Sequence, residues 1–217
     1  MTLYNKRFIQ PGIGDSYIIL LKTLKTEEYY HLYCALDPIY YAQAISEVFS
    51  LSDKIKLEFV EKPILEIPEL TSDSHDAPME FFPQFNLKNN FYINHNYYIL
   101  QAHAGKLNER NCKKLSKESI YSIIEKNNDA TCVLVGNNTE YKDIRKCINL
   151  IGETSIKDLI CLAQNCDYFI GPEGFLSFVC LSQRKFSTIF YTSHDAVKRR
   201  ILSTPWEPYS DLRFINI

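Results

Sequence analysis

The residues of this chain best suited to chemistry are two carboxylates that follow glycine-containing turns. Glu173 lies in the segment Gly171-Pro172-Glu173-Gly174, and Asp15 lies in Pro11-Gly12-Ile13-Gly14-Asp15-Ser16. Each comes shortly after an apolar segment that predicts a strand and just before one that predicts a helix. A carboxylate in this position can cap the helix, or it can accept hydrogen bonds from the hydroxyl groups of a ligand. The pattern leaves both roles open for each residue.

Basic and polar side chains follow two other predicted strands. The segment 103–114 contains His103, Lys106, Arg110, Lys113 and Lys114. Such a cluster can bind a diphosphate, although a solvated loop has the same composition. The segment 136–140, Gly-Asn-Asn-Thr-Glu, precedes a predicted helix, where Thr139 could be a simple N-cap or a ligand contact.

These four loops need a scaffold, and the apolar periodicity predicts one of alternating strands and helices. Residues 1–60 predict β-α-β-α-β, with strands at 6–9, 30–36 and 55–60 and helices at 17–24 and 39–49. The second half predicts strands at 97–102, 131–135, 167–170 and 188–191, with helices at 116–126, 140–150, 155–164 and 175–182. This alternation is typical of parallel sheets, whose ligands bind at the carboxyl ends of the strands.

The segment 61–92 interrupts the alternation and suggests a boundary. It contains four prolines and an acidic stretch, and structureless segments of this length are uncommon inside a compact domain. We therefore expect a first domain at 1–92, with 61–92 as its linker, and a second at 93–217. We also expect residues 205–217 to cross back toward the first half.

Composition narrows the classes of protein. The chain has 217 residues and is 46% hydrophobic. Its net charge is −2 and its pI is near 6.2, so it lacks the excess of basic residues that binding to a nucleic acid requires. Seven Cys occur without a C-x-x-C pair, which favours buried thiols and predicts no metal site. The start of the chain does not read as a signal peptide and no apolar run is long enough to span a bilayer, so we expect a cytoplasmic protein.

Several motifs resemble those of one family, the ADP-heptose lipopolysaccharide heptosyltransferases of glycosyltransferase family 9. The G-x-G-D turn at 12–15 resembles the family's N-terminal loop, and 132–140 is similar to its V-x-L-x-G-G-x-x-E motif. Residues 150–166 resemble L-x-G-x-T-S-L-x-E-L-A-x-L-I-x-x-A, and 167–185 follow the family's next strand and helix. The likeness is strongest over 97–192. Phe178 replaces the histidine of the family's D-S-G-x-M-H motif, and Phe175 replaces its glycine.

The resemblance implies an α/β protein of the GT-B type, with two small Rossmann-like domains whose parallel sheets face each other across a cleft. It implies inverting, metal-independent transfer of a sugar from a nucleotide diphosphate sugar to a glycan or glycolipid acceptor, in lipopolysaccharide or other surface polysaccharide synthesis. Asp15 would then be the catalytic base, beside the acceptor-side residues Gly12, Gly14 and Ser16. The expected donor-binding residues are His103, Lys106, Arg110, Lys113, Gly136, Asn137, Glu140, Gly171, Glu173 and Gly174.

Two other functions remain open. One is a GT-B-like protein that binds a nucleotide sugar or a partner without catalysis, which the loss of the family histidine favours. The other is a different GT-B-type enzyme, such as a sugar epimerase, which would need more acid and base groups. No cofactor beyond the nucleotide sugar is expected, nor any nucleic acid partner. Peripheral membrane contact stays open.

Overall fold

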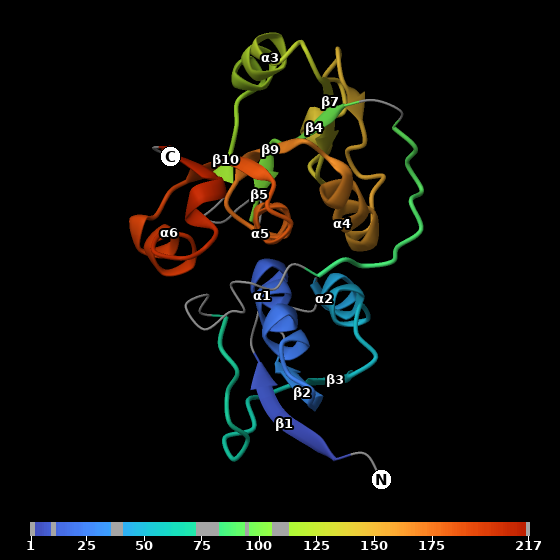
Figure 1. The fold of residues 1–217 in the computed structure, drawn as a ribbon, viewed down its shortest axis with the longest axis vertical. Coiled ribbons are helices and arrows are strands. Elements are labelled where there is room, and N and C mark those ends of the chain that lie inside the picture. The colour runs from blue at the N-terminus through green and yellow to red at the C-terminus, as the bar shows by residue number, and fades with distance from the viewer. Residues whose placement is uncertain are drawn as a thin grey trace. The chain divides into compact units, whose positions relative to one another are not determined.

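The computed structural model describes residues 3–9, 12–35, 41–72, 83–93, 96–105 and 113–215. The chain is an α/β protein that divides into two compact units, Met1–Pro83 and Gln84–Ile217 (Figure 1). The division falls inside the proline-containing segment 61–92. Each unit has its own parallel sheet, which confirms the predicted α/β class with parallel sheets.

The first unit has the β-α-β-α-β order that the sequence predicts. Its elements are β1 (Tyr4–Ile9), α1 (Ile13–Leu24), β2 (Tyr29–Ala35), α2 (Ala42–Phe49) and β3 (Ile55–Val60). The three strands are parallel in the order β1-β2-β3, and α1 packs against α2 (Figure 1). Helix α1 begins at Ile13, before the predicted start at Tyr17, because the carboxylate of Asp15 accepts a hydrogen bond from the backbone N–H of Gly12 and so caps the first turn.

The second unit contains a larger parallel sheet. Its strands are β4 (Tyr97–Gln101), β7 (Thr131–Val135), β8 (Ile148–Asn149), β9 (Tyr168–Pro172), β10 (Phe186–Tyr191) and β11 (Ser210–Phe214). They lie in the order β11-β10-β9-β4-β7-β8. Two short strands, β5 (His103–Ala104) and β6 (Lys113–Lys114), form a separate antiparallel pair. The helices are α3 (Lys117–Lys126), α4 (Ile156–Asn165), α5 (Phe175–Ser182) and α6 (His194–Arg200).

Helices cover both faces of this sheet. On one face, Tyr98 and Leu100 belong to the same buried cluster as Ile120 and Ile124 of α3. Tyr97 points to the other face, since successive strand residues alternate, and its hydroxyl donates to the carbonyl of Leu162 in α4 at 2.8 Å. The strands are therefore buried on both sides, which explains their continuous apolar runs.

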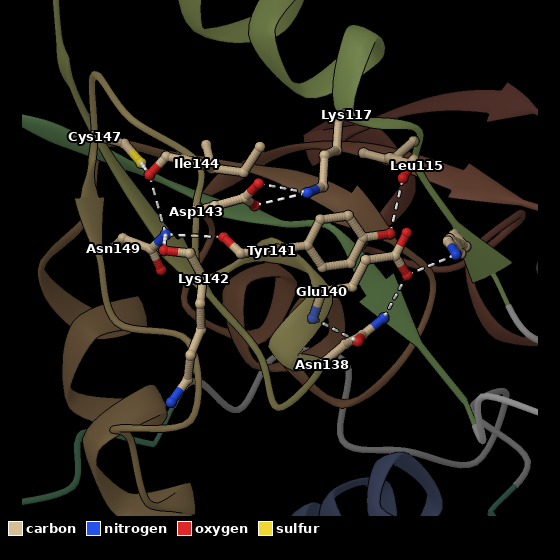
Figure 2. A network of polar contacts seen from close by, with 11 residues as sticks. Leu115, Lys117, Asn138, Glu140, Tyr141, Lys142, Asp143, Ile144, Cys147 and Asn149 are labelled. Carbon is tan, nitrogen blue, oxygen red and sulfur yellow. Dashed lines mark hydrogen bonds and ion pairs between the residues drawn. The ribbon is translucent and has the colours of Figure 1, made fainter.

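The predicted helix at 140–150 is wrong. The chain forms a single 3-10 turn, Thr139–Tyr141, and then continues to β8. Asn149 explains the difference, because its side-chain amide donates to the carbonyls of Tyr141, Lys142 and Ile144 (Figure 2). These carbonyls would otherwise bond within a helix. Lys146 also has φ 64°, a left-handed conformation that a helix interior does not contain.

The region after β10 also differs from prediction. The sequence predicts β10 as the last strand and a C-terminal segment that crosses back. Instead, α6 follows β10, and Ser210–Phe214 forms β11, parallel to Ser187–Tyr191. The expected crossing is wrong for these residues because their backbone hydrogen bonds go to the second unit's sheet. In the described ranges, no helix has the length and apolar character that crossing a bilayer requires.

Candidate functional site

The order of the strands singles out one place on the second sheet. From β4 the chain moves outward through β7 and β8, and it then returns to β9 on the other side of β4. The neighbouring strands β4 and β9 therefore lead to connections that leave in opposite directions. In open parallel sheets, ligands bind outside the carboxyl ends of the two strands where this reversal occurs. Here those ends carry Gln101, His103 and Glu173.

Gly171 lets the two strands approach each other at this point. A Cβ atom on Gly171 would lie 2.7 Å from Cζ of Phe169 and 2.9 Å from the carbonyl oxygen of Gln101. Both distances are too short for a methyl group on Gly171. The structure thus gives Gly171, predicted as a donor-binding residue, a packing role.

Glu173 is a buried carboxylate held by two cations. Its side chain is 1% exposed, and Oε2 accepts a hydrogen bond from Nζ of Lys113 at 2.6 Å. The same ammonium donates to the backbone carbonyl of Glu173 at 3.0 Å. On the other side, Nη1 of Arg200 lies 3.4 Å from Oε1 of Glu173. An ionised carboxylate at this depth requires such partners.

Phe178 lies directly beside this charge cluster. It is fully buried and stacks on Trp206, with ring centroids 5.8 Å apart. The guanidinium carbon of Arg200 lies 5.8 Å from the Phe178 centroid, within the range of a cation–π contact. Phe178 thus helps to support Arg200 at the position where the family motif has a histidine.

Strand β6 joins two of the predicted loops. Its two lysines project to opposite sides, as successive strand residues do, so Lys113 reaches Glu173 while Lys114 reaches Glu140 at 2.7 Å. The hydrogen bond from Lys114 lowers the pKa of Glu140. Asn138 caps the 3-10 turn by accepting from the backbone N–H of Glu140, and its amide donates to the Glu140 carboxylate (Figure 2). Asn138, rather than Thr139, is therefore the N-cap.

His103 and Gln101 present buried polar atoms without partners among the described residues. His103 is 6% exposed, and its Nε2 makes no hydrogen bond there; the same holds for Oε1 of Gln101. Burial lowers the pKa of His103, and nearby Lys114 adds to this effect. Buried polar atoms normally have partners, so these two are suited to ligand groups.

Three further predicted donor residues, Gly136, Asn137 and Gly174, follow strands of the second unit's sheet. Gly136 has φ +137°, which a residue with a side chain rarely adopts, and its carbonyl accepts from the N–H of Gly152 at 2.7 Å. Asn137 is exposed. Gly174 is the N-cap of α5, and its backbone N–H and carbonyl both bond to the hydroxyl of Ser177. Lys106 and Arg110 lie outside the described residues.

The first unit places the acceptor-side residues at the start of α1. Oδ2 of Asp15 accepts from the backbone N–H of Gly12 at 3.2 Å, and Oδ1 accepts from the hydroxyl of Ser72 at 2.8 Å. Ser16 is buried and donates to the carbonyl of Gly12. Gly14 lies within the first turn. Asp15 thus has the capping role that its position allows.

Sequence reasoning missed Arg200. It comes from α6, 27 residues after Glu173, in a region where no element was predicted. The one available signal was the basic run Lys198-Arg199-Arg200 at the end of an unassigned segment. Within the described ranges, no group of three or more His, Cys, Asp or Glu side chains is placed to hold a metal ion.

Comparison with known proteins gives structural neighbours only. No protein-family model matches the chain, and no curated protein matches it. Glycosyltransferase family 9 from Veillonella parvula DSM 2008 matches with a TM-score of 0.61 and 11% identity, over 99% of this chain and 87% of that one. ADP-heptose lps heptosyltransferase II of E. coli matches with a TM-score of 0.52 and 13% identity, over 100% and 91%.

A third neighbour is the dodecameric iron-containing glycosyltransferase TibC from enterotoxigenic E. coli H10407. Its TM-score is 0.58 at 13% identity, and a second structure of TibC, in complex with ADP-D-beta-D-heptose, has a TM-score of 0.51. The present chain covers 64% of TibC, less than two thirds of its length. These likenesses confirm that the fold is the GT-B-like α/β fold of the heptosyltransferase structures.

Proposed function

We propose that this protein is a glycosyltransferase that binds a nucleotide diphosphate sugar in its second unit, outside the carboxyl ends of β4 and β9. The observation that best supports this function is the cluster of Glu173, Lys113 and Arg200 beside that position. Two cations against one carboxylate leave an excess positive charge next to the strand ends. A diphosphate is a ligand whose charge complements it.

The proposed reaction uses these groups together with Asp15 of the first unit, the base that the family resemblance implies. The acceptor hydroxyl oxygen forms a bond to the anomeric carbon while the bond from that carbon to the diphosphate oxygen breaks. The hydroxyl proton passes to the Asp15 carboxylate, and the negative charge that develops on the leaving diphosphate is stabilised by Lys113 and Arg200. Attack opposite the leaving group inverts the anomeric centre. Within this proposal no metal ion is needed to stabilise the leaving group.

The proposed setting is surface polysaccharide or lipopolysaccharide synthesis in the cytoplasm, with a glycan or glycolipid acceptor. The neighbours support this setting, since one is an lps heptosyltransferase and another was crystallised with ADP-D-beta-D-heptose. Phe178 in place of the family histidine argues against carrying the heptose donor over to this chain. The experiment therefore tests several donor sugars.

The experiment is a thermal-shift panel of ADP, GDP, UDP and CDP and their sugars, without added metal, followed by an assay of nucleoside diphosphate release. A nucleotide at about 100 times its Kd stabilises the folded state by about 2.7 kcal/mol. We expect one base to stabilise the protein, Lys113→Met to weaken the effect, and the exposed-site variant Lys117→Met to preserve it. If no nucleotide stabilises the wild type, the proposed function is wrong.

A second candidate is a binding protein without turnover, which the structure of position 178 favours. Phe178 is fully buried and stacks on Trp206. The position where the family motif has a histidine therefore carries no titratable group. Asp15→Asn separates the two functions. A transferase loses diphosphate release in this variant and keeps nucleotide binding, whereas a binding protein shows no release even as the wild type.

A further inference from the structure

A pair of cysteines that the proposed transfer reaction does not use lies at the amino ends of β7 and β8. Cys132 is the second residue of β7, and Cys147 immediately precedes β8. Val133 pairs with Ile148 and Leu134 with Asn149, so extending the parallel register by one residue sets Cys132 opposite Cys147. Neighbouring strands lie about 4.8 Å apart, within the Cα separation that a disulfide spans.

The two thiols also line one depression. It measures about 540 Å³, and Cys132 and Cys147 share its wall with Glu125, Thr131 and Lys146. Cys132 is 3% exposed, whereas Cys147 is half-buried. Cys147 follows the left-handed residue Lys146, and its Sγ lies 4.0 Å from the carbonyl oxygen of Ile144 (Figure 2). Cys147 is therefore the thiol that an external reagent reaches first.

The two thiols differ in acidity. A hydrogen bond from Cys132 lowers the pKa of Cys147, while the same contact and burial raise the pKa of Cys132. An accessible thiol with a lowered pKa is the better attacking group, and a buried partner beside it can resolve the product.

We propose that Cys147 and Cys132 form a reversible thiol–disulfide exchange site that takes low-molecular-weight disulfides such as glutathione disulfide. The Cys147 thiolate attacks one glutathione sulfur, which forms a mixed disulfide and releases one glutathione thiolate. Cys132 loses its proton to solvent and attacks Sγ of Cys147, which releases the second glutathione. Two protein thiols are oxidised to one disulfide, and one glutathione disulfide is reduced to two thiols.

This bond would close a ring around residues 133–146. The ring contains Gly136, Asn137 and Glu140, which lie at the carboxyl edge of the sheet. A crosslink restricts the unfolded chain and joins the edge strand β8 to β7, so the oxidised protein should melt at a higher temperature. Oxidation would thereby stabilise the loop that carries three predicted donor-binding residues.

A second thiol pair in the same unit serves as a matched control. Cys166 and Cys180 also interact with each other, but both are fully buried. They test whether contact alone is sufficient or whether access through the depression is required. Cys112 lies outside the described residues, so the experiment uses the Cys112→Ser variant as its parent protein.

The folded parent protein is incubated with glutathione disulfide, alkylated and digested with trypsin, which cleaves after Lys142, Arg145 and Lys146 and so separates the two cysteines. We expect a linked peptide pair containing Cys132 and Cys147, a higher melting temperature, and reversal of both by dithiothreitol. Cys132→Ser should stop at a glutathione adduct on Cys147, and Cys147→Ser should form neither product. A linked Cys166–Cys180 pair in place of the expected one, or no adduct in Cys132→Ser, would overturn the proposal.

Discussion

Replacing the charge of Glu173 by a neutral group should destabilise the second unit more than the same change at an exposed charged side chain. Glu173→Gln keeps the side-chain volume but leaves the ammonium of Lys113, 2.6 Å away, and the guanidinium of Arg200, 3.4 Å away, without a counter-charge. Breaking a buried ion pair by removing one partner costs about 3–5 kcal/mol. The side chains of Lys113 and Arg200 are 16% and 26% exposed, so water partly solvates them. We therefore expect a loss near the lower end, about 3 kcal/mol.

Urea unfolding followed by tryptophan fluorescence measures this loss directly. Trp206 is the one tryptophan of the chain, is 5% exposed, and stacks on Phe178 beside the cluster, so its signal reports on the second unit. With an m-value of about 2 kcal/mol/M, a loss of about 3 kcal/mol lowers the urea midpoint by about 1.5 M.

A double-mutant cycle tests whether the effect comes from the ion pair. Lys113→Met alone should also destabilise the protein, because Glu173 then keeps, among the described residues, only the longer ion pair to Arg200. The double variant should lose less than the sum of the single losses, by about 1–2 kcal/mol. Asp143→Asn, which breaks the exposed pair with Lys117 (Figure 2), is the control and should leave the midpoint nearly unchanged. If Glu173→Gln shifts the midpoint no more than this control does, the inferred role of Glu173 is refuted.

Three further predictions concern Gly171, Ser155 and His103. Gly171→Ala should cost about 2–3 kcal/mol in urea unfolding, because its Cβ would lie 2.7 Å from Phe169 and 2.9 Å from Gln101. Ser155→Ala should cost about 1 kcal/mol by removing the N-cap of α4, and a Ser155→Asp variant that retains most of the stability would support the capping explanation. His103 has a lowered pKa in the folded state, so the unfolded chain binds its proton first as the pH falls below the ordinary value near 6.5. Stability should therefore decrease from pH 6.5 downward in the wild type and less so in His103→Asn, as measured by urea midpoints; equal slopes would contradict this.

The fold was largely predictable because its signals are local. Ser116 and Ser155 cap α3 and α4, as their side chains and the apolar periodicity that follows them suggest. The strand at Thr131–Val135 was predicted to the residue. The helix at 140–150 failed because the side chain of Asn149 bonds the carbonyls that a helix would use. Periodicity carries no information about such a bond.

The candidate site was less predictable because its contacts are distant in sequence. The loops around Glu173 and Lys113 were identified separately, but their ion pair joins residues 60 positions apart. The sequence predicts a polar loop after the strand at 97–102, whereas the structure forms the short strands β5 and β6, and β6 carries Lys113 to Glu173. His103 belongs to the same strand pair, where it lies opposite Lys114.

At position 178 the chain keeps the helix of the family motif but has a phenylalanine in place of its histidine. A histidine there would place a polar ring in a fully buried position against Trp206, where desolvation opposes its charged form. Phe178 avoids that cost, and Arg200 brings a positive charge to the face of the same ring from a different helix. An arginine stays charged at every physiological pH, whereas a histidine titrates within that range. Arg200 thus supplies a positive charge beside Glu173 without the motif histidine, so the loss of that histidine does not by itself imply the loss of an anion site.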